Sequence, residues 1–421
     1  MPELVLVNAI LSLVQVIETM KNLCLYIHIP FCVRKCNYCD FLSAPCDDTT
    51  KQEYVDALCG EIIERAESFH EKQVDTIFFG GGTPSVLSGE QMEQIMGTVR
   101  EYFQILPEAE ISMEMNPGTV DKEKLESYKK VGINRLSIGL QSANNEELKV
   151  LGRIHTWEDF LRTWEMVREA GFTNVNIDLM SALPGQTVES YSETLDKVLK
   201  LKPEHISAYS LIVEEGTLFD EWYGEDGERQ DQLPDEATDR HMYEMTEQKL
   251  EENGYYRYEI SNYALPGYEC KHNIGYWKRK EYLGLGLGSA SLLFKETTGG
   301  LCKNIRCSNV SDLNCYLNIG MEQDMFGEFI HDENMWTAEQ TKLTKKDQME
   351  EFMFLGLRMM EGVSSQEFED QFGQSLQEVY GSKIAKLETQ GLLEQKEESG
   401  RYALTKKGID VSNQVFVEFL F

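Results

Sequence analysis

Positive charge is scarce in this chain of 421 residues, in which 40 Lys and Arg stand against 72 Asp and Glu. The formal net charge of −32 repels the phosphate backbone of nucleic acids, so a nucleic-acid partner is excluded. We expect most of the acidic side chains on a solvated surface. Cysteine is sparse as well, because 10 residues in a chain of this length are too few for a disulfide scaffold. A reduced compartment, the cytoplasm, is therefore predicted.

Long apolar runs are also missing. The N-terminal stretch MPELVLVNAILSLVQVIET is rich in apolar side chains but contains no Lys or Arg, which a secretory signal needs. Polar residues interrupt it before the length of about 20 apolar residues that a membrane span requires. No stable membrane insertion is predicted. Met20 stands just before the first expected strand, and we interpret residues 1–19 as an upstream or non-native extension.

Strand-like and helix-like segments alternate through the first half of the chain. Six short apolar or alternating runs are each followed by a longer amphipathic stretch, which predicts an α/β fold with a parallel sheet, most simply a partial (β/α)6 barrel. The functional groups of such a barrel gather at the carboxyl ends of its strands. The expected strands cover 24–30, 75–80, 111–116, 135–141, 174–180 and 206–213, and the expected helices include 54–69, 89–102, 157–170 and 188–199.

The second half of the chain is less regular. Residues 214–240 are acidic and rich in turn residues, which predicts a surface excursion, and residues 301–333 are interpreted as an insertion or linker. We expect three regions beyond the extension: a barrel at 20–240, a region at 241–340 that completes it, and a C-terminal module at 341–421.

The C-terminal module has its own pattern. Three helical stretches, at 348–361, 365–372 and 376–391, precede a β-hairpin, and this order resembles an α+β winged-helix module. Residues 341–421 hold 14 Asp and Glu against 10 Lys and Arg. A docking domain is therefore favoured over a DNA-binding one.

Three cysteines, Cys32, Cys36 and Cys39, stand in one short segment with the spacing Cys-x3-Cys-x2-Cys. A structural zinc site is one interpretation, with Cys46 or His28 as a fourth ligand, although such sites usually combine paired Cys-x2-Cys or Cys/His units. The other is a [4Fe–4S] cluster, in which three thiolates leave one iron open to a further ligand. We favour the cluster.

The residues around these cysteines suit an anionic cluster. Arg34 and Lys35 lie inside the segment, where positive charge lowers the pKa of thiols and offsets negative charge. Phe31, Tyr38 and Phe41 flank it. Apolar cover of this kind limits the access of water and tunes the reduction potential.

Polar side chains occupy one face of three successive expected strands, because polar and apolar residues alternate in each. Helices cover the outer face of a barrel, so we expect the polar set to point inward. Carboxylates and amides there suit the hydroxyl groups of a nucleoside, and ordinary hydrogen bonding within a barrel core is the alternative. The residues are Ser112, Glu114 and Asn116, then Arg135, Ser137 and Gln141, then Asn174, Asn176 and Asp178.

A glycine turn, Phe79-Gly-Gly-Gly-Thr-Pro-Ser85, follows the second expected strand and lets backbone groups approach a ligand. With the motif Cys-x3-Cys-x-aromatic-Cys, it resembles the radical S-adenosylmethionine (SAM) superfamily. The resemblance implies that the methionyl amine and carboxylate of SAM chelate the open iron, and that an electron from the cluster cleaves SAM to a 5′-deoxyadenosyl radical. It also implies that Gly81, Gly82 and Thr83 bind the methionyl end.

Longer phrases between residues 24 and 292 resemble the oxygen-independent coproporphyrinogen III oxidase group. They are Tyr26-Ile-His-Ile-Pro-Phe-Cys, Glu114-Met-Asn-Pro-Gly, Gly139-Leu-Gln-Ser, Leu151-Gly-Arg-Ile-His-Thr, Asp178-Leu-Met-Ser-Ala-Leu-Pro-Gly and Tyr258-Glu-Ile-Ser-Asn-Tyr. The resemblance places a set of residues around SAM and the cluster: Tyr26, Tyr38, Gly81, Gly82, Thr83, Glu114, Gln141, Arg153 and Asp178.

That group contains oxidases and a branch of haem chaperones, the HemW type. Oxidases of the group carry a further cysteine soon after the cluster motif, where this chain has Asp40-Phe41. They also have a substantial segment ahead of the motif, and here only 25 residues precede Tyr26. Both features favour the chaperone branch.

The segment Cys270-Lys-His-Asn-Ile-Gly-Tyr-Trp277 resembles the motif linked with haem in these chaperones. A neutral imidazole can ligate haem iron, and Tyr276 and Trp277 offer flat surfaces to a porphyrin. His272 is therefore a candidate haem-binding residue. Packing of a His and a Trp at the end of the barrel is the alternative.

The sequence as a whole predicts a haem chaperone that binds haem and transfers it to a client protein, with the cluster and SAM supporting transfer or dimerisation. The sequence is compatible with a homodimer. The alternative is an oxygen-independent coproporphyrinogen III oxidase, an enzyme of porphyrin biosynthesis that decarboxylates its substrate oxidatively to protoporphyrinogen IX.

Overall fold

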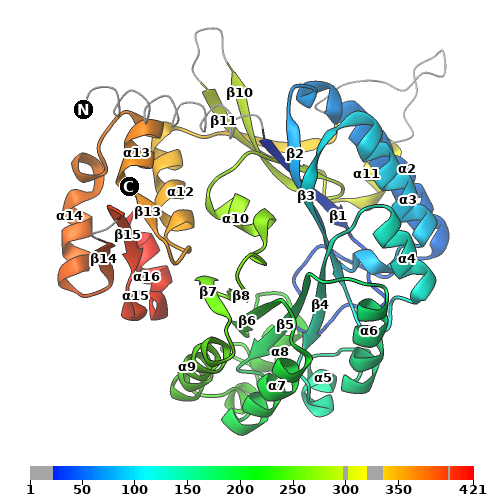
Figure 1. The fold of residues 1–421 in the computed structure, drawn as a ribbon, viewed down its shortest axis with the longest axis horizontal. Coiled ribbons are helices and arrows are strands. Elements are labelled where there is room, and N and C mark those ends of the chain that lie inside the picture. The colour runs from blue at the N-terminus through cyan, green and yellow to red at the C-terminus, as the bar shows by residue number, and fades with distance from the viewer. Residues whose placement is uncertain (1–21, 297–301, 320–334, 397–398) are drawn as a thin grey trace.

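The structure of the protein, a computed structural model, describes residues 22–296, 302–319, 335–396 and 399–421. The extension expected at 1–19 lies outside these residues. Figure 1 shows a strongly curved sheet with helices along its convex side and a second group of helices formed by the C-terminal part of the chain.

Six parallel strands form the centre of the sheet and confirm the predicted α/β class and the parallel, barrel-like half. In the first of them, Leu23, Leu25 and Ile27 alternate with polar or aromatic residues and are fully buried. Such alternation lets one face of each strand pack on helices while the other lines the interior. The strands are β1 (Asn22–Ile29), β2 (Gln73–Gly81), β3 (Gln104–Met115), β4 (Arg135–Gln141), β5 (Val175–Ser181) and β6 (His205–Ser210).

The helices between these strands begin at polar capping residues. Ser88, Thr156 and Thr187 each accept a hydrogen bond from a backbone amide of the first turn that follows and form capping boxes, which satisfy otherwise unpaired amides. The α-helices of this half are α2 (Asp48–Ala66), α3 (Gly89–Tyr102), α4 (Lys122–Lys130), α5 (Asn145–Val150), α6 (Trp157–Glu169), α7 (Val188–Leu201), α8 (Leu218–Tyr223) and α9 (Glu236–Glu252). Short 3-10 turns cover Glu67–Phe69, Pro84–Val86 and Gln230–Gln232.

Further strands extend the sheet at both edges to twelve. On the β1 side, β9 (Tyr282–Leu285) pairs in parallel with β1, and β10 (Ala290–Glu296), β11 (Cys302–Asn309) and β12 (Thr337–Lys342) follow antiparallel. On the β6 side, β8 (Asn262–Ala264) and β7 (Tyr256–Glu259) form a hairpin. The turn after β9 requires glycine at Gly286, whose φ is +96° and where a Cβ would lie 2.5 Å from the Tyr54 hydroxyl.

Two predictions about irregular segments are incomplete. Residues 301–333 are not simply a linker, because β11 and helix α11 (Leu313–Ile319) lie within them. β11 pairs with β10, the strand before it in the chain, and with β12, so these neighbours, rather than an apolar alternation of its own, make it a strand. The acidic segment 214–240 is not only a surface excursion either, since Phe219 and Tyr223 of α8 are buried.

The C-terminal helices and a small sheet have a hydrophobic core of their own, formed by residues such as Met353, Phe368 and Tyr380. The predicted order of three helices and a hairpin is present, and two short helices follow it. The elements are α12 (Lys345–Gly356), β13 (Val363–Ser364), α13 (Ser365–Phe372), α14 (Leu376–Thr389), β14 (Leu393–Lys396), β15 (Arg401–Leu404), α15 (Lys406–Asp410) and α16 (Ser412–Glu418).

An ion cluster, buried at Glu351 and Arg279 and partly exposed at Arg306, joins this part to the sheet. Glu351 of α12 binds the Nε of Arg279 at 2.9 Å and the Nε of Arg306 in β11 at 2.7 Å. The short helix α10 (Lys271–Trp277) ends two residues before Arg279. It lies between the sheet and α12 in Figure 1 and contacts both β2 and α12.

Candidate functional site

The loop that carries the three cysteines leaves the carboxyl end of β1 and leads into α2. Its backbone is tied down close to the strand, because the amide of Ala44 donates to the Pro30 carbonyl at 2.9 Å and the amide of Cys32 donates to the Ala44 carbonyl at 3.2 Å. Its middle is tied to the segment after α5, where the Asn37 amide donates to the Leu151 carbonyl at 3.0 Å. The structure therefore holds the loop over the carboxyl ends of the strands, as the barrel pattern predicts.

All three predicted cluster ligands are free thiols, and each is partly exposed. The Thr83 hydroxyl lies 3.4 Å from the Cys32 sulfur, and Nη1 of Arg153 donates to the Cys36 sulfur at 3.5 Å. Burial raises the pKa of the Cys39 thiol. Across the described residues, no three His, Cys, Asp or Glu side chains converge closely enough to hold a single metal ion.

The glycine turn lies directly beside this loop. The amide of Gly82 donates to the Ile29 carbonyl at 2.9 Å, and the amide of Thr83 donates to the Phe31 carbonyl at 2.8 Å. Gly81 has a φ of +109°, and a Cβ there would lie 2.4 Å from Cε1 of His28. Glycine is required at this position both by the backbone conformation and by the close approach of the imidazole.

The polar faces of β3, β4 and β5 meet inside the barrel, as their alternation predicts. Ser137 donates to the Asp178 carboxylate at 3.1 Å, and Nδ2 of Asn176 donates to Asp178 at 2.7 Å. The Glu114 carboxylate accepts from the Gly81 amide at 3.2 Å. Burial raises the pKa of Glu114 to about 8, and the neighbouring Asp178 adds to the rise; burial likewise raises the pKa of Asp178.

Gln141 and Arg153 lie at the same end of the barrel. Gln141 closes β4 with a φ of +71°, an uncommon conformation for a residue other than glycine, and accepts a hydrogen bond from the Tyr209 hydroxyl at 3.4 Å. Arg153 donates through Nη2 to the Asn116 amide oxygen at 2.6 Å. The structure thus brings Thr83, Glu114, Gln141, Arg153 and Asp178 to the carboxyl-end side of the sheet.

Two further predicted residues flank this region. Tyr26, in the middle of β1, binds Nδ1 of His28 at 3.0 Å, and Nε2 of His28 lies 3.0 Å from the Leu42 carbonyl in the cysteine loop. Burial raises the pKa of Tyr26 and lowers that of His28. Tyr38 packs against Phe219 of α8 with 6.1 Å between ring centroids.

His272 is held away from the cysteine loop. It lies in α10, and its Nδ1 is 2.8 Å from the Thr76 hydroxyl in β2, while its Nε2 is 3.1 Å from the Tyr276 hydroxyl. The residue is 1% exposed, and burial lowers its pKa to about 3, with the Arg135 charge adding to the fall. The imidazole is therefore neutral, and both of its nitrogens have hydrogen-bond partners in this conformation.

The first turn of α10 is anchored by a buried carboxylate. Glu110 of β3 accepts the backbone amides of Lys271 and His272 at 3.1 and 3.2 Å, which satisfies donors that a helix leaves unpaired at its start. The residue is 6% exposed. α10 thus lies against the inner side of β2 and β3, nearer their starts than the cysteine loop does.

Sequence reasoning placed Asn116 in the inward polar set and considered His28 only as a zinc ligand, but it assigned neither residue to the set around SAM and the cluster. Asn116 has the same polar parity as Ser112 and Glu114, so the alternation of β3 contained a signal for it. His28 stands in the phrase Tyr26-Ile-His-Ile-Pro-Phe-Cys, but only the fold places its ring between Gly81 and the cysteine loop.

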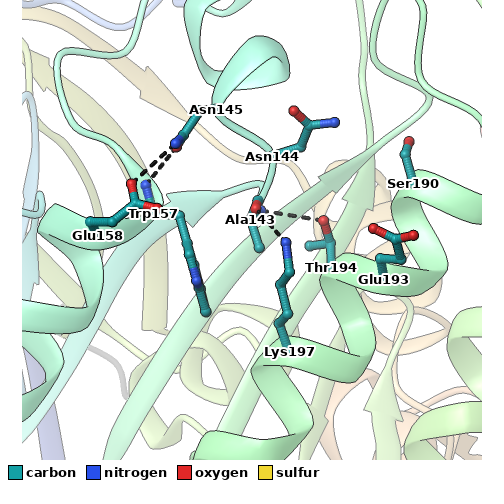
Figure 2. Close-up of a pocket in the computed structure, with 9 residues that line it drawn as sticks. All are labelled: Ala143, Asn144, Asn145, Trp157, Glu158, Ser190, Glu193, Thr194 and Lys197. Carbon is teal, nitrogen blue, oxygen red and sulfur yellow. Dashed lines mark hydrogen bonds between the residues drawn. The ribbon is translucent and has the colours of Figure 1, made fainter.

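One surface pocket beside the barrel helices lies elsewhere. Figure 2 shows a surface pocket of about 330 Å³ between the start of α6 and one side of α7, and no residue predicted for the cluster, SAM or haem lines it. Nζ of Lys197 donates to the Ala143 carbonyl at 3.0 Å and lies 5.8 Å from the Trp157 ring. The pocket is therefore separate from the candidate site.

Comparisons with known proteins agree with this geometry. Residues 26–198 match the radical SAM superfamily, and residues 343–411 match the HemN C-terminal domain. Heme chaperone HemW of Lactococcus lactis is 37% identical over 94% of this chain and 96% of its own length. Heme chaperone HemW of Bacillus subtilis is 36% identical over 94% of this chain and 98% of its own length. The chain belongs to the HemW family of radical SAM proteins.

A solved structure supports the wider group to which the HemW family is related. Coproporphyrinogen III oxidase (HemN) from Escherichia coli, a radical SAM enzyme, is 26% identical, with a TM-score of 0.78 over 95% of this chain and 90% of that one. The predicted resemblance to the coproporphyrinogen oxidase-like group is confirmed.

Membership of the radical SAM superfamily implies a [4Fe–4S] cluster and SAM. The donor set fits such a cluster, because three free thiols share one loop and two of them lie beside the hydrogen-bond donors Thr83 and Arg153. Within the part of the chain that the structure describes, no helix is both long and apolar enough to cross a lipid bilayer.

Proposed function

We propose that this protein is a haem chaperone that binds haem and transfers it to a client protein. The observation that carries the proposal is the match to HemW chaperones, which extends over 94% of the chain and therefore includes the barrel, α10 and the C-terminal module. The acidic surface disfavours nucleic acid as a partner. We place the protein in the cytoplasm, where a homodimer is compatible with the proposal.

The cysteine loop is proposed to hold the cluster through Cys32, Cys36 and Cys39, and SAM is proposed to lie over the adjacent strand ends. A reduced [4Fe–4S] cluster with SAM on its open iron supplies one-electron chemistry. Gly81, Gly82 and Thr83 would present backbone groups to the methionyl end. The residues proposed to hold the rest of SAM are Tyr26, Tyr38, Glu114, Gln141, Arg153 and Asp178.

Glu114 and Asp178 suit the ribose of SAM for a physical reason. Both carboxyls are withdrawn from water, and each raised pKa reflects a charge that lacks solvation. Ribose hydroxyl groups would donate hydrogen bonds to them and so replace the missing water. The binding of SAM is thereby expected to favour the ionised carboxylates.

His272 is proposed as the haem ligand, with Tyr276 and Trp277 beside the porphyrin. Its low pKa keeps the imidazole neutral, which ligation of iron requires. Ligation through Nε2 would break the 3.1 Å hydrogen bond to Tyr276. Haem binding at this residue therefore entails a local rearrangement of α10.

A chain of buried hydrogen bonds leads from the proposed SAM site to α10. Asn176 binds Asp178 at 2.7 Å and Nδ1 of His205 at 2.6 Å. Nε2 of His205 lies 2.8 Å from the Tyr258 hydroxyl, which accepts the amide of Cys270 at 3.3 Å, directly before α10. These contacts support a role for SAM in haem transfer, because both proposed sites share one polar interior.

The second candidate function is oxygen-independent coproporphyrinogen III oxidase, which the similarity to the HemN structure favours. Against it, Asp40-Phe41 stands where the oxidases of the group are expected to carry a further cysteine. The two functions differ in what reconstituted protein does with a porphyrin: one binds haem unchanged and the other decarboxylates coproporphyrinogen III.

A paired assay on one anaerobically reconstituted sample separates them. Haem is titrated while the Soret band is recorded, and coproporphyrinogen III turnover is measured in parallel. We expect a saturable Soret shift in the wild type, its loss in His272→Ala, and no decarboxylation. His70→Ala is the matched control, because His70 is exposed and should bind haem as the wild type does.

Catalytic turnover of coproporphyrinogen III would contradict the chaperone proposal. An unaltered Soret titration in His272→Ala would instead show that the protein binds haem and that His272 is not the residue that ligates the iron.

A further inference from the structure

Asn116 connects the hydrogen-bond partners of two proposed cluster cysteines, Cys32 and Cys36. Its Nδ2 donates to the Thr83 hydroxyl at 2.8 Å, and that hydroxyl lies 3.4 Å from the Cys32 sulfur. Its Oδ1 accepts from Nη2 of Arg153 at 2.6 Å, and Nη1 of the same guanidinium donates to the Cys36 sulfur at 3.5 Å. One amide side chain therefore hydrogen-bonds to the partner residue in both sulfur contacts.

The orientation of the Asn116 amide follows from the chemistry of its partners. Arg153 has only donors, so the amide must turn its oxygen toward the guanidinium and its NH₂ group toward Thr83. The Thr83 oxygen then accepts from Asn116, and its own proton is free for another acceptor. The Cys32 sulfur, which has no proton as a thiolate, is the acceptor within reach.

Asn116 contacts the hydrogen-bond partners of the cysteines, Thr83 and Arg153, and has no room for a ligand of its own. The cavity that borders it also touches Thr83, Cys36 and Arg153 and measures about 20 Å³. This is space for about one water molecule. The backbone of Asn116 is fixed as well, since its amide donates to the Ser85 hydroxyl at 3.3 Å.

We propose that Asn116 is a positioning residue that directs the Thr83 hydroxyl to Cys32 and the Arg153 guanidinium to Cys36, and so raises the reduction potential of the cluster. Hydrogen bonds to thiolate ligands stabilise the more electron-rich, reduced state of an iron–sulfur cluster. The inference rests on the proposed function in one respect, namely that these cysteines hold a [4Fe–4S] cluster.

The sharpest variant is Asn116→Asp, which keeps the size and still accepts from Arg153. A carboxylate has no donor, so the Thr83 hydroxyl would turn to donate to it and leave the Cys32 sulfur. Thr83→Val removes the same donor directly, and Thr83→Ser retains it. The double variant Asn116→Asp/Thr83→Val separates the loss of this donor from the added negative charge.

The readout is the midpoint potential of the reconstituted cluster, followed by electron paramagnetic resonance during a redox titration without SAM or haem. We expect a shift to more negative potential in Asn116→Asp and in Thr83→Val, and a wild-type potential in Thr83→Ser. Asn116→Asp should shift the potential less in the Thr83→Val background than in the wild type, because the donor is already gone.

Thr119→Val is the matched control, since the Thr119 hydroxyl donates to the Asn116 carbonyl at 2.7 Å and, among the described residues, makes no hydrogen bond to a cysteine. It should lower the melting temperature of the cluster-free protein and leave the potential unchanged. If Asn116→Asp fails to take up a cluster, Asn116→Ser takes its place, because serine is too short to reach both partners and the potential should again fall.

Two results would overturn the inference. One is an unchanged potential in Thr83→Val, and the other is an equal shift from Asn116→Asp in both backgrounds, which would mean that charge alone acts. Failure of the wild type to take up any [4Fe–4S] cluster would instead refute the proposed function, and the inference would fall with it.

Discussion

At the scale of single residues, Glu114 changes charge near neutral pH. Burial and the neighbouring Asp178 raise the pKa of its carboxyl from 4.5 to about 8 in the folded protein. The folded state therefore keeps a proton that the unfolded chain releases at lower pH. Because the folded state binds more protons, the stability that Glu114 contributes falls as pH rises from about 4.5 to about 8.

Glu114→Gln removes this titration. In SAM-free protein, we expect the variant to be more stable than the wild type, with an advantage that grows between pH 6 and pH 9 by on the order of 2 kcal/mol, since one pKa unit corresponds to about 1.4 kcal/mol. Urea unfolding at the two pH values measures the difference. Glu108→Gln, on the same strand but exposed, is the control. An advantage that stays constant with pH would contradict the raised pKa.

Much of the site could be predicted residue by residue from the sequence. The alternation of β3, β4 and β5 placed Glu114 and Asp178 on one inner face, and the structure brings them together there. Alternation predicts the face of the sheet on which a side chain lies, but it does not predict which residues that side chain contacts. The Thr83–Asn116–Arg153 contacts depend on three separate segments, so they became visible only in the folded chain.

At the scale of elements, the position of α10 could not be predicted from the sequence. Its motif predicted chemistry for His272, but its location follows from Glu110 of β3, 162 residues earlier, which binds the amide of His272. β11 was missed for a related reason, because pairing with β10 and β12, rather than an apolar alternation of its own, makes it a strand. In both cases contacts with other elements decide the structure and the local pattern does not.

Tyr276→Phe tests the arrangement of α10. The variant removes the hydroxyl group bound to Nε2 of His272 and leaves the bond of Nδ1 to Thr76 in place. If haem iron binds Nε2, association should become about fivefold faster, the equivalent of a side-chain hydrogen bond of about 1 kcal/mol that no longer has to break. Stopped-flow Soret measurements give the rate. An unchanged rate would mean that Nε2 is not the ligand atom.

At the scale of the whole molecule, Glu351 holds the C-terminal module against the sheet. It joins Arg279 just after α10 to Arg306 in β11, and both Nη atoms of Arg279 are buried without a hydrogen-bond partner. The module and the barrel therefore share a charge cluster at the end of α10. The sequence indicated a docking domain, but not which residues dock, because the partners of Glu351 are 72 and 45 positions away.

Glu351→Gln should be strongly destabilising, by about 3 kcal/mol, because removing one partner of a buried ion cluster leaves the remaining charge uncompensated. Chemical denaturation measures the loss. Glu418→Gln is the control within the same module, since Glu418 pairs with Lys386 at the surface and should cost less than about 1 kcal/mol. Equal, small losses for the two variants would contradict a buried ionic joint.

Haem transfer from this protein to a client tests the central claim most directly. Protein loaded with haem is mixed with a haem-free haemoprotein from the same cell, and the rate of Soret change is compared with the rate of passive haem loss to apomyoglobin. We expect the client to be filled faster than haem is lost passively, which only direct transfer allows. A client rate equal to or below the passive rate would contradict the proposal that this HemW-family protein is a haem chaperone.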